Sequence, residues 1–222
     1  YQVLKGALTF AFVVGTIAAI VVYFGAEFFT ATLLKTPYSV FALKILGPAL
    51  VVVAVLGVLR GFFQGLGTMM PSAISQIIEQ IVNAIISIWA AYVLTGYGKR
   101  IGAVLGDPEH YGAAYGAAGG TLGTNLGAVA GLLFVLFVFF AYMRVFKRRM
   151  RRERNVQVDS FSYTMKILIV TIIPVLLSTT VYNISGIIDQ GIFKNVALLQ
   201  GYSDVHVGMT NIPYQSDLEY LK

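Results

Sequence analysis

The sequence contains no cysteine and only two histidines, and charged residues make up 12% of its 222 residues. Without cysteine, neither a disulfide framework nor a thiolate metal site is available. His110 and His206 lie in predicted loops without a partner at ligand spacing, so we expect surface histidines rather than metal ligands. A phosphate-binding Gly-Lys-Ser/Thr motif and a nucleophile–base pair are also absent. We therefore predict no catalytic residue, no metal and no resident cofactor, and a protein that is not an enzyme.

Long apolar runs are what the chain has instead, with 57% hydrophobic residues. Five runs have the roughly 20 residues that a helix needs to cross a bilayer core of about 30 Å. They cover about residues 7–26, 41–59, 72–94, 111–142 and 167–188. Lipid cannot satisfy the backbone of an open strand, so each run is predicted to be a helix. We expect an all-α, multi-pass integral membrane protein with about five transmembrane helices, followed by an extramembrane loop over 191–222.

Seven basic residues gather between the fourth and fifth runs, against a single glutamate. They are Arg144, Lys147, Arg148, Arg149, Arg151, Arg152 and Arg154. Such a block beside a hydrophobic segment indicates the cytoplasmic face of a membrane. On the same count Lys5 and Arg60 fall inside, whereas Lys99 and Arg100 fall outside. The net charge of +6 is then a topology signal. We expect no nucleic-acid partner.

Glycine and proline mark three further features. Residues 61–71 form a short glycine-rich loop, with Pro71 at the start of the third helix. Pro174 lies inside the fifth run, where it is expected to kink the helix. In the fourth run, glycines recur every four residues, at 112, 116 and 120 and at 119, 123, 127 and 131. Such ridges let helices approach closely, either within one bundle or at a dimer interface.

The third run carries polar residues along one helical face. They recur in three- and four-residue steps, at Ser72, Ser75, Gln76, Glu79, Asn83 and Ser87. Glu79 lies about 12 Å into the helix, too deep for its side chain to reach the interface. An ionisable group at this depth indicates a functional site. Either Gln76, Glu79 and Asn83 line a hydrophilic pathway, or Glu79 belongs to an interhelical polar clamp, for example with Arg60.

Other candidate residues lie at the ends of the runs. Arg60, followed by Gln64, ends the second run, where a guanidinium can bind phosphate or can simply mark the interface. The second half of the fifth run is polar and includes Asn183 and Asp189. Asp189 is either a contact for a cation or sugar or an anchor at the interface.

The segment from Arg60 to about Asn83 resembles a known group of transporters. An Arg-Gly-aromatic-x-Gln-Gly loop is followed by Pro-x-Ala-x-Ser-Gln and by the pair Glu79-Gln80. This pattern is similar to the polysaccharide-biosynthesis, stage V sporulation protein B-like branch of the multidrug/oligosaccharidyl-lipid/polysaccharide (MOP) flippase superfamily. The Gly-Ala-Ala that opens the fourth run, the basic loop and Ile187-Ile188-Asp189 are also similar.

The resemblance implies a fold of two six-helix lobes facing each other across a central cavity. On that mapping residues 1–143 hold helices three to six of the N-terminal lobe, and 144–160 form the cytoplasmic linker between the lobes. Residues 161–190 hold the first helix of the C-terminal lobe, and 191–222 form a truncated extracytoplasmic loop. We therefore expect a piece of a longer protein.

The implied function is a flippase for a lipid-linked oligosaccharide or cell-wall precursor in the bacterial plasma membrane, working by alternating access. The expected partners are membrane lipid and the lipid-linked glycan, and the expected state is a monomer. Coupling of transport to H⁺, Na⁺ or the membrane potential is left open. The implied cavity residues are Arg60, Gln64, Gln76, Glu79, Asn83, Asn183 and Asp189. A cation-coupled multidrug exporter of the same fold, or a non-transporting scaffold for envelope or spore assembly, remains an alternative.

Overall fold

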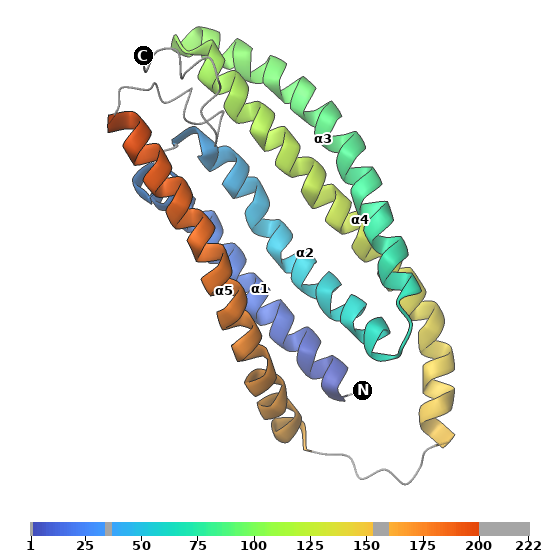
Figure 1. Cartoon of the computed structure of the whole chain (residues 1–222). Coiled ribbons are helices and arrows are strands. Elements are labelled where there is room, and N and C mark those ends of the chain that lie inside the picture. The colour runs from blue at the N-terminus through green and yellow to red at the C-terminus, as the bar shows by residue number, and fades with distance from the viewer. Residues whose placement is uncertain (1, 34–36, 153–159, 200–222) are drawn as a thin grey trace, which may run out of the picture.

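The structure, a computed structural model, describes residues 2–33, 37–152 and 160–199. Five long helices account for almost all of them (Figure 1). They are α1 (Gln2–Glu27), α2 (Val40–Gly65), α3 (Met70–Leu105), α4 (Pro108–Arg152) and α5 (Phe161–Leu199). A π-helical turn, Phe28–Leu33, follows α1, and a 3₁₀ turn, Pro37–Ser39, precedes α2.

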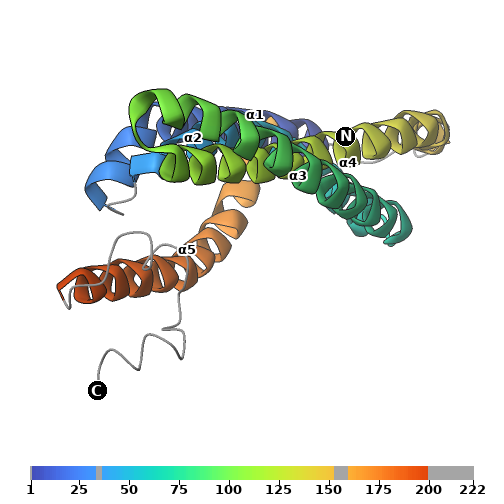
Figure 2. The same cartoon turned by 90° about the horizontal axis from the view of Figure 1, so that it is seen from above.

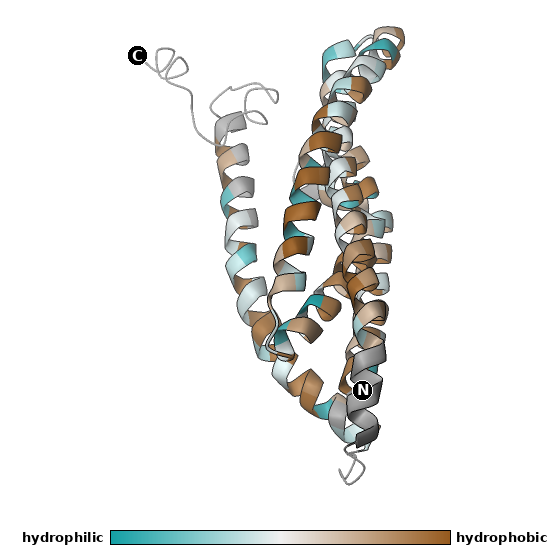
Figure 3. Ribbon diagram, turned by 90° about the vertical axis from the view of Figure 1, so that its right-hand side faces the viewer, coloured by the Kyte–Doolittle hydropathy of each residue, from teal (hydrophilic) through white to brown (hydrophobic). Residues whose placement is uncertain are grey.

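The five helices are each long and apolar enough to cross a membrane. Apolar residues occur along the length of the helices, as the hydropathy colouring shows (Figure 3). Many of their side chains are exposed. Phe12, Phe24, Ile77, Ile85 and Phe137 are all more than half exposed. In water such surfaces would be unstable, whereas in lipid they are the normal exterior of a spanning helix. The prediction of an all-α membrane protein with five spanning helices is confirmed.

The helices extend past the predicted runs. The third run was predicted to end at residue 94, yet α3 continues to Leu105 and takes Lys99 and Arg100 with it. It ends where Gly106 adopts a left-handed conformation (φ +85°), which a residue without Cβ reaches at little cost. Loss of hydropathy marks where the lipid ends, but a helix ends only where its backbone is interrupted.

Three predicted loops are partly helical for the same reason. The 61–71 loop shrinks to a turn over 66–69, because α2 runs to Gly65 and α3 begins at Met70. The basic run continues α4 as far as Arg152, while Arg154 lies outside the described residues. The loop predicted from residue 191 begins as the last turns of α5, which ends at Leu199. Its remainder lies outside the described residues.

The tightest packing in the bundle joins α3 and α4 along the glycine ridge (Figure 1). A Cβ added at Gly119 would meet the Ala90 carbonyl at 2.6 Å, and one at Gly127 would meet the Glu79 carbonyl at 2.7 Å. The ridge is therefore an internal helix–helix contact, as expected for small residues at four-residue spacing. For these positions, packing within one bundle is therefore confirmed, rather than a dimer interface.

The remaining helices form a second group beside this pair. Helix α1 packs on α2, and α2 packs on α4. Helix α5 meets α1 near its start, where Phe161 and Met165 lie beside Gly6, and the rest of α5 diverges from the other helices (Figure 2). A small apolar core joins α1, α2 and α4 near the end that carries the basic run. It consists of Leu4, Leu56, Leu59, Phe63, Val135 and Phe139. Arg60 directly follows Leu59 of this core, so its backbone is fixed by packing.

Candidate functional site

The polar site lies between α2 and α3, beside this core. Arg60 donates from Nε to Ser75 Oγ at 2.8 Å and from Nη2 to Glu79 Oε2 at 2.7 Å. The side chains of Arg60 and Glu79 are 16% and 19% exposed. At membrane depth a guanidinium and a carboxylate that neutralise each other cost much less than either charge alone.

The turn between the two helices sets the register of the ion pair. Gly67 takes a positive φ (+79°), and Pro71 lies in the first turn of α3, where its missing N–H is not needed. Ser72 Oγ then donates to the Arg60 carbonyl at 3.2 Å, and Ser75 Oγ donates to the Ser72 carbonyl at 2.7 Å. Both serines are buried. This chain of bonds ties the last turns of α2 to the first turns of α3.

Helix α4 closes the third side of the site through Gly131. A Cβ at Gly131 would lie 3.3 Å from Arg60 Nη2, 3.4 Å from the Ser75 carbonyl and 3.5 Å from Glu79 Cβ. Contacts this close mean that the guanidinium occupies the space a larger side chain would fill. The site is therefore a three-helix junction.

The polar face of α3 continues from Glu79 toward the other end of the bundle. Asn83 Oδ1 accepts from Ser87 Oγ at 2.8 Å and from Thr124 Oγ1 at 3.4 Å, and Ser87 Oγ also lies 2.9 Å from the Gly120 carbonyl. These groups face α4. Apart from Gln76, which is exposed, the face is thus used for hydrogen bonds and an ion pair from Ser72 to Ser87, the arrangement expected of a polar clamp.

The structure brings three of the predicted site residues together and leaves the others apart. Arg60, Glu79 and Asn83 lie along the junction, whereas Gln64 and Gln76 have exposed side chains. Asn183 and Asp189 are exposed on α5, which packs on α1 rather than on α2 or α3. Within the part of the chain that the structure describes, Asn183 donates only to the Thr179 carbonyl of its own helix, at 2.7 Å. The described residues show no common site for α5 and the Arg60–Glu79 pair.

Asn125 is a polar contact that sequence reasoning missed. Its Nδ2 donates to the Ile45 carbonyl of α2 at 2.6 Å. Pro48 has no N–H, so the Lys44 carbonyl next to it lacks its usual helical donor. Neighbouring helices commonly satisfy backbone groups near a membrane proline in this way. The sequence feature that could have indicated this contact is a single asparagine within the apolar fourth run.

A second polar cluster lies at the opposite end, where the α3–α4 turn meets the 3₁₀ turn before α2. His110, predicted to be an isolated loop residue, instead lies in the first turn of α4 with its Nδ1 2.7 Å from Asp107 Oδ1. Tyr38 donates to Asp107 Oδ2 at 2.9 Å, and its ring stacks on His110 with centroids 5.1 Å apart. The prediction that His110 has no partner was wrong, because Asp107 lies only three residues before it and accepts its hydrogen bond. His206 lies outside the described residues.

The pKa of Asp107 is lowered from its ordinary value of 3.8, chiefly by the hydrogen bond from His110. The bond to Asp107 in turn raises the pKa of Tyr38. A carboxyl whose pKa is depressed by folding stabilises the fold above its unfolded pKa, and that contribution is lost as pH falls through the folded value.

We expect Asp107→Asn to lower the thermal unfolding midpoint at pH 7, because the neutral amide loses the charge-assisted bond from His110. The difference from the wild type should shrink below pH 3.8. Thermal scans in detergent from pH 7 to pH 3 measure this. Glu109→Gln is the matched control, since Glu109 lies in the first turn of α4, beside His110, and is exposed. A difference that grows on acidification would contradict the expectation.

The fold and the site together define a multi-pass, all-α membrane protein with an ion pair at a three-helix junction. Over 101 residues the chain is 32% identical to the lipid II flippase MurJ of Bacillus subtilis (strain 168). The match covers 42% of this chain and 19% of that protein, so it spans about a fifth of the relative. MurJ is a member of the MOP superfamily, and the predicted resemblance to that group is confirmed over this part of the chain. No family model and no solved structure matches the chain.

Proposed function

We propose that the complete protein is a membrane flippase, which moves a lipid-linked oligosaccharide or cell-wall precursor across the bacterial plasma membrane by alternating access. The similarity to a lipid II flippase is the observation that carries this proposal. The five spanning helices agree with it. In this proposal the basic run on α4 lies at the cytoplasmic end, as the positive-inside rule favours.

In this proposal the Arg60–Glu79 pair is the closed form of an anion site. The guanidinium is held at 2.7 Å by a carboxylate and lies near the end of the bundle where the substrate would enter. The phosphate groups of a lipid-linked glycan can replace that carboxylate, because both present a pair of oxygens to the planar guanidinium. Glu79, once released, takes up a proton or another cation, and Asn83 continues the polar path.

Coupling then follows from charge balance. A free carboxylate at membrane depth is expensive, so Glu79 leaves Arg60 more easily when a cation neutralises it. A gradient of H⁺ or Na⁺, or the membrane potential, would in this way drive the exchange in one direction. Glu79→Gln removes the charge but keeps an oxygen that can accept from Arg60.

Translocation of a fluorescent lipid-linked precursor in proteoliposomes tests the proposal. We expect the full-length protein to flip the precursor at a rate that depends on the imposed gradient. Glu79→Gln should slow flipping about tenfold, which corresponds to about 1.4 kcal/mol in the barrier. Gln76→Ala, on the exposed side of the same helix, should flip normally if the pair is the site.

Two experimental outcomes would favour a different function. Drug resistance on expression without precursor flipping would favour a multidrug exporter of the same fold. Full cellular function of a folded variant lacking both charges would favour a non-transporting scaffold.

A further inference from the structure

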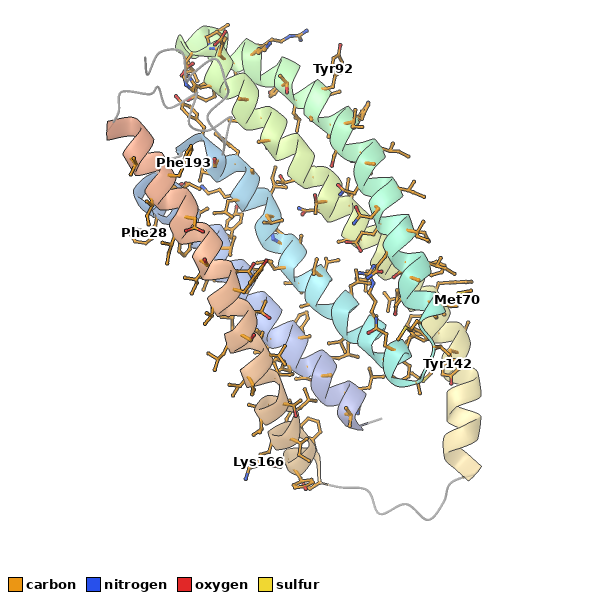
Figure 4. All side chains as sticks on the ribbon, in the orientation of Figure 1. Phe28, Met70, Tyr92, Tyr142, Lys166 and Phe193 are labelled. Atoms are coloured by element: carbon orange, nitrogen blue, oxygen red, sulfur yellow. The ribbon has the colours of Figure 1, made fainter. Side chains whose placement is uncertain are left out.

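The far end of α3 carries an open hollow that the flippase proposal does not use. It has a volume of about 680 Å³ and is lined by a single stretch of the helix, from Ala91 to Arg100. Its lining residues are Ala91, Tyr92, Val93, Thr95, Gly96, Tyr97, Lys99 and Arg100. Tyr92 points away from the bundle (Figure 4) and is 83% exposed.

Gly96 creates this hollow. A Cβ built at Gly96 meets no atom within 4 Å, unlike the glycines that contact α4. The helix surface is therefore bare between the apolar side chains of one turn, Tyr92 and Val93, and the cations of the next. A glycine within a helix costs stability unless packing or function repays it, and no packing among the described residues uses this one.

The two cations have no acidic partner among the described residues. Glu27, Glu79 and Asp107 pair with Lys44, Arg60 and His110, and none pairs with Lys99 or Arg100. The stem of Lys99 lies flat across α4, with its Cγ 2.7 Å from where a Cβ of Gly112 would stand. Adjacent cations, one of them held in place by packing, form a site for an anion.

The length of α3 places this site at the level of lipid headgroups. The helix has 36 residues, or about 54 Å at 1.5 Å per residue. The hydrocarbon core takes about 20 of those residues, and a further 5–7 Å of interface follows. With the helix centred on the bilayer, the core residues run from about 78 to 97, so Tyr97 lies where aromatic side chains mark the interface. Lys99 and Arg100 then lie about 17–19 Å from the bilayer centre, at the depth of the headgroups.

We propose that this hollow binds the phosphate headgroup of an anionic glycerophospholipid such as phosphatidylglycerol. The phosphate contacts Lys99 and Arg100, and the upper acyl chain lies in the notch at Gly96 against Tyr92 and Val93. A free phosphate would use the cations alone, whereas the apolar half of the lining fits only a lipid. Basic pockets at the membrane surface recognise headgroups through the same chemistry.

Native mass spectrometry of the full-length protein in detergent, titrated with phosphatidylglycerol or phosphatidylcholine, tests this site. We expect the wild type to prefer phosphatidylglycerol. Removal of each charge should weaken binding about fivefold, so Lys99→Gln/Arg100→Gln weakens it about 25-fold. Gly96→Leu should weaken the binding of phosphatidylglycerol by filling the notch for the acyl chain, and it should not impair folding, because leucine is the better helix former.

The matched controls are Lys166→Gln, which removes an exposed cation from α5, and Gly57→Leu, which fills an equally open glycine position on α2. Both should bind phosphatidylglycerol as the wild type does. Equal binding of the two lipids by the wild type would overturn the proposal, as would unchanged binding of phosphatidylglycerol in both test variants. Full displacement of the lipid by millimolar inorganic phosphate would assign the site to a free anion instead.

Discussion

Replacing Glu79 with alanine is expected to destabilise the protein by about 2–3 kcal/mol. Removing one partner of a buried ion pair costs about 3–5 kcal/mol, because the other charge is left unpaired. The side chains here are 16% and 19% exposed, so water relieves part of that cost. Arg60 would keep only its bond to Ser75, at 2.8 Å. Chemical or thermal unfolding in detergent measures the loss.

The apolar double variant Arg60→Met/Glu79→Leu is the control that separates charge from packing. It removes both charges together and leaves no orphaned donor in this group, because Ser75 Oγ still bonds to the Ser72 carbonyl. Replacing a buried pair by apolar residues of similar volume is often neutral. We expect this variant to recover most of the stability lost in Glu79→Ala. Equal stability of the wild type and Glu79→Ala would show that the pair does not hold the junction.

The same variant distinguishes the polar clamp from the transport pathway. A clamp alone is satisfied by any well-packed replacement, so a folded double variant would retain its activity. An anion site needs the guanidinium itself, so the double variant would fold and fail to flip substrate. Stability and translocation therefore have to be measured on one preparation.

The sequence predicted the helices well because their signal is local. An apolar run of about 20 residues has no stable form in lipid except a helix, whatever surrounds it. The ends of the helices depend on where the backbone is interrupted, which hydropathy does not report. Lys99 and Arg100 are polar enough to suggest a loop, yet nothing in the backbone interrupts α3 before Gly106.

The ion pair shows where a single sequence stops being informative. Arg60 and Glu79 were both recognised as unusual, but two readings of Glu79 stayed open. Their contact depends on the turn over 66–69 and on the close approach of Gly131. Gln76 illustrates the converse, since periodicity put it on the polar face while α2 and α4 cover the neighbouring Ser75 and leave Gln76 exposed. Which part of a face is covered is decided by the partner helices.

Two adjacent glycines of α4 should respond in opposite ways to the same substitution. Gly119→Ala places a methyl group 2.6 Å from the backbone of Ala90 and Ala91, which cannot move without displacing α3. Overpacking of this kind costs about 1–3 kcal/mol. At Gly120 a Cβ meets nothing within 4 Å. There alanine only improves helix propensity, so Gly120→Ala should be neutral or more stable by up to about 1 kcal/mol.

The pair is a close control because the two positions share one helix, one depth and one substitution. Only the Cβ position of Gly119 faces α3, so a difference in unfolding midpoint reports the helix–helix contact rather than a general effect of alanine in α4. A displacement of α3 at Gly119 should also alter the packing farther along the same contact. At Gly127, where a Cβ would lie 2.7 Å from the Glu79 carbonyl, the distance between the two helices would change as well. Gly119→Ala should therefore lower the flipping rate as well as stability, while Gly120→Ala leaves both intact; equal midpoints for the two variants would mean that α3 and α4 do not pack through this ridge.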